Sequence, residues 1–278
     1  MMKKVFVAYG SGSYLNSLRR IGREARKLHL FHKVILYRES DLPSFIKSSP
    51  LMAYKRGGGY WVWKPYIIWK TMQQYPDAIV VYADCGCTLQ TNMEEWERWF
   101  RLLETYDSVA FRYRLDYDYP WQPMVQRETI DAVWTKKALV DYFDPLLGGC
   151  EWIMSGQVWS GLVLSCRNCK AVRMWMDITL MHPELVIDCF GNEIVGQGPA
   201  FFEHRHDQSI WSAVCSYWER VDDNTVKVLE ETAESDSKAA VLATRIHDVP
   251  REPLKTRVIR AIKQTVGDKA YNKMHFWN

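Results

Sequence analysis

The residues best placed to do chemistry include an aspartate at the end of the clearest strand pattern in the chain. The run "AIVVYA" (78–83) is apolar and partly β-branched, Asp84 follows it, and Gly86 comes two residues later. A carboxylate in that position can bind a divalent cation or a ribose hydroxyl, while a glycine lets the backbone approach a diphosphate. The alternative interpretation is that Asp84 only caps a turn.

A second group of polar side chains lies in "EHRHDQS" (203–209), where Glu203, His204, His206 and Asp207 precede a helical pattern. Asp207 suits a helix N-cap, because a carboxylate there accepts backbone N–H groups. At a helix N-terminus the same groups could instead complete a metal shell, or bind or deprotonate a sugar hydroxyl. The residue types alone do not choose between these interpretations.

A third candidate is the loop "RGGGYWVWKP" (56–65), which combines glycines and large aromatic residues with a cation near each end. It is not a phosphate-binding P-loop, because Lys64 is followed by Pro65 and the required spacing is absent. After the first strand, "YGSGSYLNS" (9–17) has Leu15 where a dinucleotide-binding fingerprint needs its third glycine. Hydride transfer on a dinucleotide is therefore poorly supported.

Two further patterns are weaker candidates for metal binding. Asp116 and Asp118 form a carboxylate pair in "DYD", but the aromatic residues around them favour a sugar-facing or loop-packing surface. Cysteines recur as C-x-C at 85–87 and C-x-x-C at 166–169, whereas a zinc site normally needs two pairs at established spacings. We expect the cysteines to be free thiols in a reducing compartment.

The order of predicted elements indicates an α/β fold. In the first half of the chain, short apolar runs alternate with segments in which apolar residues recur at helical spacing. This order of strands and helices is typical of a mainly parallel sheet with helices on both faces. Ligands of such sheets bind beyond the carboxyl ends of the strands, where Asp84 is expected. Strands are predicted at 3–9, 33–37, 78–84, 107–113 and 157–166, helices at 14–29, 41–48, 64–74, 92–105, 135–143, 168–182 and from Asp207, and a polar surface hairpin or excursion at 219–238.

Charge is unevenly distributed along the 278 residues, whose net charge is +3. Residues 251–278 hold seven basic and two acidic residues, so the rest of the chain is slightly acidic. We therefore expect one domain over 1–250 and a basic tail, with no nucleic-acid partner. In the tail, apolar residues recur every four positions over 254–266, which fits a helix on an anionic membrane or a helix packed on the domain.

Location is predicted from what the sequence lacks. The start of the chain has too short an apolar run for a signal peptide, and no window reaches the length of a membrane span. We expect a cytoplasmic protein, with peripheral contact to the inner face of a membrane if the tail binds lipid.

Four segments together resemble one enzyme family. They are "RGGGYWVWKPYII" (56–68), "VVYADCGC" (80–87), "WTKKALVDYF" (134–143) and "EHRHDQSIWS" (203–212), and the resemblance spans about residues 1–215. This set is similar to bacterial and viral GT-A type glycosyltransferases of surface-polysaccharide biosynthesis. The resemblance implies a single GT-A-like domain that transfers a hexose from a nucleotide-diphosphate sugar to a hydroxyl of a glycan or lipid-linked acceptor.

The resemblance also implies roles for individual residues. Asp84 would contact metal and nucleotide-sugar, and Asp207 would be the candidate base beside the acceptor or donor sugar. The resemblance places Gln208 on the same side as Asp207, and it leaves a loop beside the donor made of Arg56, Gly58, Gly59, Tyr60, Trp63 and Lys64. Tyr82 and Gly86 are further donor-side candidates, and His206 is a further catalytic candidate.

One departure from the family pattern concerns the metal. The usual Asp-x-Asp signature is here Asp84-Cys85-Gly86, so the second carboxylate is missing. A histidine, His204 or His206, could supply the missing ligand to Mn²⁺ or Mg²⁺. Two other classes stay open: a nucleotidyltransferase acting on sugar phosphates, and a non-catalytic sugar-binding protein, for which the 13 Trp and 15 Tyr residues would suffice.

Overall fold

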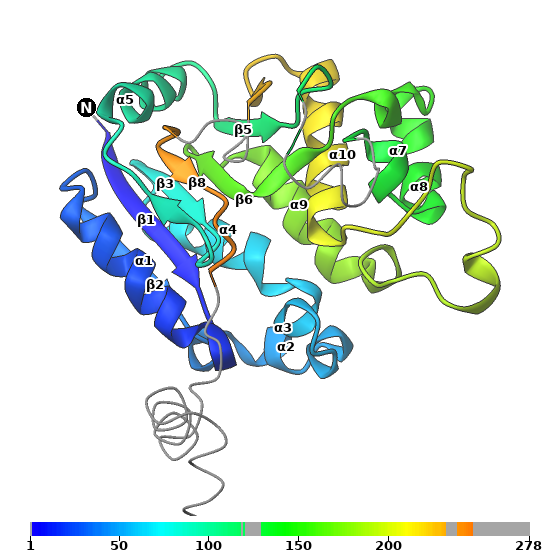
Figure 1. The fold of residues 1–278 in the computed structure, drawn as a ribbon, viewed down its shortest axis with the longest axis horizontal. Coiled ribbons are helices and arrows are strands. Elements are labelled where there is room, and N and C mark those ends of the chain that lie inside the picture. The colour runs from blue at the N-terminus through cyan, green and yellow to red at the C-terminus, as the bar shows by residue number, and fades with distance from the viewer. Residues whose placement is uncertain (1, 118, 120–128, 232–237, 247–278) are drawn as a thin grey trace, which may run out of the picture.

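The computed structural model describes residues 2–117, 119, 129–231 and 238–246. A six-stranded sheet organises this part of the chain, in the order β2-β1-β3-β6-β5-β7 (Figure 1). Its strands are β1 (Lys3–Tyr9), β2 (Lys33–Tyr37), β3 (Ala78–Ala83), β5 (Ser108–Arg112), β6 (Val158–Ser165) and β7 (Val226–Leu229). The pairings show that β6 runs opposite to the other five strands. The predicted α/β domain with a mainly parallel sheet is confirmed.

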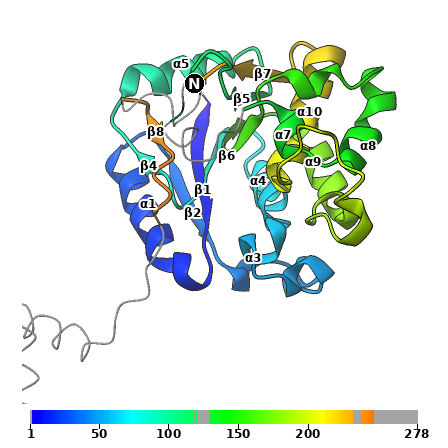
Figure 2. The ribbon, with the colours of Figure 1, turned by 45° about the vertical axis from the view of Figure 1, so that its right-hand side comes forward.

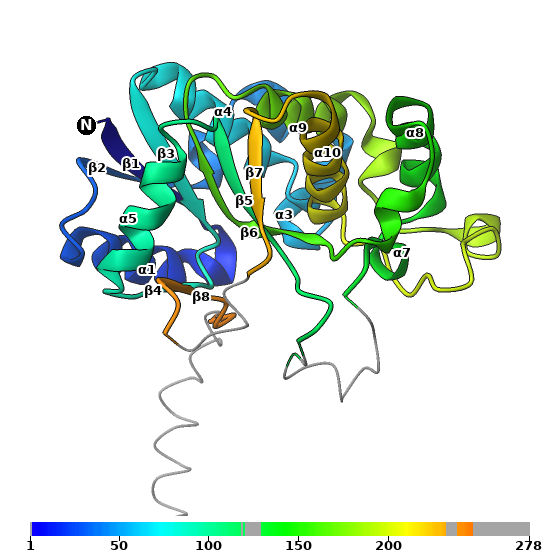
Figure 3. The same cartoon turned by 90° about the horizontal axis from the view of Figure 1, so that it is seen from above.

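Helices cover both faces of this sheet, as Figures 2 and 3 show. One face carries α1 and α5, and the other carries α4, α9 and α10. The helices of the described residues are α1 (Leu15–Lys27), α2 (Ser44–Lys47), α3 (Gly57–Tyr60), α4 (Trp63–Gln74), α5 (Met93–Leu102), α7 (Asp131–Trp134), α8 (Lys137–Leu147), α9 (Lys170–Met181) and α10 (Asp207–Val221).

The alternation of side chains along β1 explains why the sheet has two cores. Phe6 and Ala8 pack with the helices of one face, whereas Val5 and Val7 pack with those of the other. Successive side chains of a strand point to opposite faces, so a strand buried on both sides must be apolar throughout. This is why such continuous apolar runs were recognisable as strands.

Two predicted elements differ from the observed ones. The polar segment 219–238 was expected to be a surface hairpin or excursion, but Val226–Leu229 pairs in parallel with β5 as an edge strand of the main sheet. The short helix expected over 41–48 begins at Ser44, because Pro43 holds the chain extended at the helix N-cap. Asp41 instead ends a 3₁₀ turn, where its carboxylate accepts a hydrogen bond from the Arg38 backbone N–H at 2.8 Å.

A small two-stranded sheet pairs β4 (Thr88–Leu89) with β8 (Val241–Leu242), the last strand of the described residues. Among the described residues, no helix is both long and apolar enough to cross a bilayer. The predicted division into a domain over 1–250 and a basic tail stays a prediction, because the tail lies outside the described residues.

Candidate active site

A buried lysine joins the two segments that were expected to face one another. Lys64, in the first turn of α4, is 1% exposed, and its Nζ lies 2.7 Å from Asp207 Oδ2 and 3.2 Å from Asp84 Oδ1. The same ammonium donates a hydrogen bond to Ser160 Oγ at 3.2 Å. Burial lowers the pKa of Lys64, but the two carboxylates outweigh this effect, so its pKa lies above the ordinary value. The lysine is therefore charged and fully engaged.

Asp84 lies where the strand pattern placed it, one residue after β3. Its backbone N–H donates to Gly161 O of β6 at 2.8 Å, which fixes the chain at this edge of the sheet. The Tyr82 hydroxyl donates to Asp84 Oδ1 at 2.5 Å. Burial and the Asp84 charge raise the pKa of Tyr82 well above its usual range, so this hydroxyl stays a donor. Asp84 remains the more open of the two carboxylates, since its side chain is 36% exposed and that of Asp207 is 5% exposed.

Asp207 is the first residue of α10 and not its N-cap, which corrects the capping interpretation. Its carboxylate turns away from the helix backbone to Lys64, and Oδ2 also accepts a hydrogen bond from Ser160 Oγ at 2.9 Å. Burial raises the pKa of Asp207, and the Lys64 ammonium opposes the rise. The next residue, Gln208, donates to Gln157 Oε1 at 2.6 Å, and its Oε1 lies 3.5 Å from the Ser160 backbone nitrogen.

His206 takes the N-cap position of α10 with a left-handed φ of 51°. Its Nδ1 lies 2.8 Å from Val186 O, while Nε2 is 3.6 Å from Asp188 Oδ1, beyond hydrogen-bond distance. Burial lowers the pKa of His206 to about 4, so the imidazole is neutral at neutral pH. Its ring stacks on Trp61, with centroids 5.7 Å apart. A base with so low a pKa is poorly matched to proton abstraction near pH 7.

The histidine proposed as a metal ligand is fully occupied by backbone groups. His204 Nδ1 accepts a hydrogen bond from the Lys136 N–H at 3.3 Å, and Nε2 lies 2.9 Å from Leu185 O. Binding a metal would cost His204 one of these contacts. Within the described part of the chain, no three His, Cys, Asp or Glu side chains form a group that could hold a metal ion.

A divalent cation therefore has no preformed protein cage in the described residues. Asp84 offers one carboxylate beside the strand end, and Mg²⁺ is commonly held by one or two carboxylates together with substrate phosphates. The donor set fits a cation that arrives with a phosphorylated ligand, and it does not fit a structural metal.

The glycines of the loop before α4 let the backbone adopt conformations that other residues rarely adopt. Gly58 and Gly59 have φ values of 58° and 95°, which favour glycine. A side chain at Gly59 would meet Met52 Sδ at 2.6 Å, whereas one at Gly58 would have only Ser11 Oγ and the Trp63 indole nitrogen within 4 Å. The structure therefore explains Gly59 by packing and leaves more room at Gly58.

An aromatic residue of this loop packs against the sheet. Trp63 stacks on Tyr9 at the end of β1, with ring centroids 3.8 Å apart, and its indole N–H donates to Gly57 O at 3.2 Å. In Figure 1, α3 lies near the end of β1 where the arrowhead is drawn.

Arg56, at the start of the same loop, remains accessible. Its guanidinium lies 3.3 Å from Asp188 Oδ1 and 3.6 Å from Glu203 Oε2, and its side chain is 44% exposed. The Tyr60 hydroxyl donates to Asp188 Oδ2 at 2.6 Å. Asp188 was missed from the sequence, because a single acid in an irregular segment carries no signal of its long-range partners.

Gly86 is covered by the protein's own backbone. Its carbonyl oxygen accepts hydrogen bonds from the Ile246 N–H at 2.9 Å and the Thr244 hydroxyl at 2.8 Å. A side chain at Gly86 would lie 3.4 Å from Arg245 Cα. The backbone segment after β8 is therefore what lies close to Gly86. A contact between Gly86 and a diphosphate stays a prediction.

Ser160 and Gln157 also belong to the site and were missed. Ser160 is a buried polar residue within the apolar run of β6, and Gln157 immediately precedes that strand. A hydroxyl inside an otherwise apolar strand was the available signal. The weaker metal candidates gain no support: Asp116 pairs with Arg114 at 2.7 Å on the surface, Asp118 lies outside the described residues, and all seven cysteines are free.

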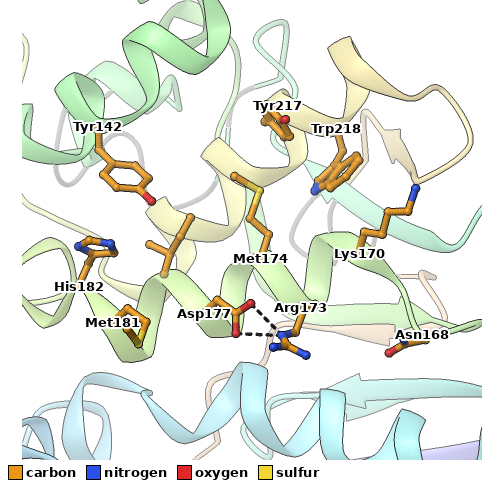
Figure 4. A pocket seen from close by; sticks show the side chains of 11 residues that line it. Tyr142, Asn168, Lys170, Arg173, Met174, Asp177, Met181, His182, Tyr217 and Trp218 are labelled. Carbon is orange, nitrogen blue, oxygen red and sulfur yellow. Dashed lines mark hydrogen bonds and ion pairs between the residues drawn. The ribbon is translucent and has the colours of Figure 1, made fainter.

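A groove of about 440 Å³ lies elsewhere, along α9 and near the C-terminal end of α10 (Figure 4). Its charged groups are already paired: Arg173 with Asp177 at 2.8 Å, and Lys170 with Asp222 at 3.7 Å. Among the described residues, none that lines the groove comes from the segments 80–87 or 203–212, whereas buried Lys64 joins Asp84 to Asp207, so the cluster around Lys64 is the better candidate.

Comparisons with known proteins give remote similarities only. No protein-family model matches the chain, and no curated protein matches it. Among solved structures, a glycosyltransferase involved in glycosylation of the major capsid of PBCV-1 is 9% identical, with 82% of each chain covered and a TM-score of 0.42. Mouse xyloside xylosyltransferase 1 is 13% identical, covering 82% of this chain and 85% of that one, with a TM-score of 0.42.

A third similar structure is glucosyl-3-phosphoglycerate synthase from Mycobacterium tuberculosis, solved with Mn²⁺, UDP-glucose and phosphoglyceric acid. It is 12% identical, covers 96% of this chain and 78% of its own, and has a TM-score of 0.39. At these scores the similarity carries no information about activity, which depends on the side chains of the site.

Proposed function

We propose that this protein is a GT-A type glycosyltransferase that moves a hexose from a nucleotide-diphosphate sugar to a hydroxyl of a glycan or lipid-linked acceptor. The observation that carries the proposal is the Lys64 ammonium held between Asp84 and Asp207. These carboxylates come from the two segments whose motifs resemble the donor and sugar sides of that family. The bridge shows that both segments reach one place at the carboxyl end of β3.

The electrostatics of this place suit the departure of a diphosphate. Glycosyl transfer builds positive charge on the sugar and negative charge on the leaving phosphate, so fixed charges of both signs are useful close together. Lys64 supplies a positive charge that is already desolvated and held in position. Asp84 and Asp207 supply negative charge beside it, toward the sugar.

Asp207 is the candidate base if the reaction inverts the anomeric centre. Burial pushes its pKa upward, in the direction of the working pH of a general base, while Lys64 and Ser160 hold the carboxylate in place. Gln208, the neighbouring residue, offers an amide that can bind a sugar hydroxyl. If the reaction retains configuration, Asp207 instead serves to orient the sugar.

A divalent cation, Mn²⁺ or Mg²⁺, would be held by Asp84 together with the donor phosphates, and it would neutralise charge on the leaving group. His204 has no part in this proposal, because its ring nitrogens contact backbone groups. Arg56, with its exposed guanidinium, is the second cation available to a donor phosphate.

The test is a panel of nucleotide-sugars incubated with the purified protein, with and without Mn²⁺. We expect a UDP-, GDP- or dTDP-sugar to raise the melting temperature and to be slowly hydrolysed without acceptor. CMP-sugars, which lack a diphosphate, serve as the negative control. The Asp84→Ala variant should stay folded and lose the response. If no diphosphate sugar is bound or cleaved by the folded protein, the proposal fails; retention of nucleoside triphosphates alone would indicate a nucleotidyltransferase.

Membrane contact through the basic tail is a separate proposal, based on the charge of residues 251–278. A polybasic amphipathic segment binds anionic lipid reversibly. Sedimentation with anionic vesicles should remove the full chain from solution but not a chain ending at Pro250, and neutral vesicles provide the control. Equal sedimentation of the two chains would contradict this role for the tail.

A further inference from the structure

A fully buried carboxylate lies beneath the first turns of α10, outside the cluster around Lys64. Asp131, the first residue of α7, is 0% exposed. Its oxygens accept hydrogen bonds from Gln157 Nε2 at 3.0 Å, from Thr135 Oγ1 at 3.1 Å and from Ser212 Oγ at 2.6 Å. All three hydrogen-bond donors are uncharged, and burying a carboxylate without an ion pair is costly. The position therefore calls for an explanation beyond packing.

The carboxylate determines which way two neighbouring side-chain amides face. An ionised carboxylate only accepts hydrogen bonds, so Gln157 must turn its NH₂ group toward Asp131. Its amide oxygen then faces α10 and accepts the hydrogen bond from Gln208 Nε2 at 2.6 Å. Gln208 must in turn direct its oxygen toward the Ser160 backbone N–H, 3.5 Å away. Each amide orientation follows from the one before it.

This chain of hydrogen bonds ends at the candidate catalytic cluster. Ser160 accepts a hydrogen bond from Lys64 Nζ and donates one to Asp207 Oδ2. All members of the chain are buried, with exposures of 9% for Gln208, 3% for Ser160 and 1% for Gln157. In such surroundings a misdirected amide would leave unpaired polar groups, so the orientation is strongly determined.

We propose that Asp131 is a positioning residue, which acts through Gln157 to fix the orientation of the Gln208 amide beside the Lys64–Asp207 pair. Its effect on turnover rests on the proposed glycosyltransferase function, whereas its effect on Gln208 does not. The hydrogen-bond partners of the Asp131 carboxylate are Gln157, Thr135 and Ser212. Neither of the candidate catalytic carboxylates, Asp84 and Asp207, is among these partners.

The first experiment measures the orientation directly. In ¹⁵N-labelled full-length protein, the side-chain NH₂ resonance of Gln208 is identified by its absence from Gln208→Ala. Asp131→Asn should shift or split this resonance, because an asparagine amide can either donate to Gln157 or accept from it. Thr135→Val is the matched control: it removes another hydrogen bond to Asp131 and should leave the resonance in place.

A folded Asp131→Asn variant with an unchanged Gln208 resonance would overturn the proposal, as would an equal shift in Thr135→Val. If Asp131→Asn does not fold, Gln157→Met removes the link while leaving the carboxylate intact. It should displace the same resonance, and an unchanged Gln208 signal in that variant would overturn the proposal equally well.

The second experiment is a double-mutant cycle on donor cleavage. Asp131→Asn should lower kcat about ten-fold by misplacing Gln208. In the Gln208→Ala background the same substitution should cause no further loss, because its effect passes through that side chain. Full additivity would indicate a merely structural role and contradict the proposal. If the unmodified protein cleaves no donor, the function proposal fails, while the resonance experiment still decides the role of Asp131.

Discussion

The N-terminal end of α10 and the groove along α9 differ in how their polar groups are satisfied. At the N-terminal end of α10, Asp207 and Gln208 are buried and bonded to Lys64, Ser160 and Gln157 from distant parts of the chain. In the groove along α9, Arg173 pairs with Asp177, one turn away on the same helix. Local surface pairs contribute little to stability, whereas a buried network fixes the relative placement of several elements.

The two regions differ in how far their charged groups are removed from water. The groove is the more visible feature, but its charges are paired and remain in water. The buried end has Lys64 and Asp207, whose desolvation is offset by their ion pair and by hydrogen bonds with Ser160, next to the partly exposed Asp84. Substitutions in the two regions should therefore have very different effects on the free energy of unfolding.

The largest effect is expected for Lys64→Met. Removing one partner of a buried ion pair leaves uncompensated charge, so the free energy of unfolding should fall by about 3–5 kcal/mol. Donor cleavage should be lost as well. Urea denaturation measures the first effect, and Lys170→Met in the groove is the control, with an expected change below about 0.5 kcal/mol. If Lys64→Met and Lys170→Met lower the free energy of unfolding by similarly small amounts, the N-terminal end of α10 and the groove do not differ as described.

The next prediction concerns pH. Burial raises the pKa of Asp131 to about 6, above that of an unfolded aspartate. Between about pH 4 and pH 6, Asp131 is therefore protonated in the native state and ionised in the unfolded state. Stability from this group is highest at low pH and is lost as pH rises toward 6, by roughly 3 kcal/mol in total. The difference in unfolding free energy between the unmodified protein and Asp131→Asn should follow this course between about pH 4 and pH 7. A difference that is independent of pH would contradict it.

Asp207→Asn should reduce kcat about a hundred-fold if the carboxylate is the general base, at the lower end for such a group. The fold should persist, because the amide oxygen can still accept hydrogen bonds from Lys64 and Ser160. Asp177→Asn in the groove, which also neutralises an aspartate, should leave kcat unchanged. A loss of less than ten-fold in Asp207→Asn would indicate a retaining reaction or an orienting role.

The smallest effect is expected for the surface pair. Arg173→Gln should change the free energy of unfolding by about 0.3–0.5 kcal/mol, the usual value for an exposed pair spaced one helical turn apart. Added salt should reduce even this difference, because exposed charges are screened. A change above 1 kcal/mol that resists salt would show that the groove is more tightly organised than its exposure indicates.

Much of the fold could be predicted from the sequence, because the sheet strands are buried on both faces and read as continuous apolar runs. β3 and the position of Asp84 after it are examples. The edge strand β7 could not, since "VKVL" is short and its neighbours are polar. A strand at an edge is half solvated, so its pattern resembles that of a surface loop.

The site was predictable in its segments but not in its contacts. Lys64 reads locally as a cation at the start of a helix, and nothing nearby in sequence shows that it is 1% exposed. Its partners are set by how α4, β3 and α10 meet, which periodicity does not encode. His206 shows the same limit: an imidazole suggests a base, while its burial and backbone partner make it a poor one.

The reversed direction of β6 has a consequence for how the site could change. Because β6 runs against β3, its beginning lies beside the place where β3 finishes, and Ser160 sits there next to Asp84. The connecting segment that leads to Ser160 is thus at the same end of the sheet as the turn after β3. Insertions in residues 148–156 would add chain at that end, close to Ser160 and Asp84, while every strand pairing is preserved.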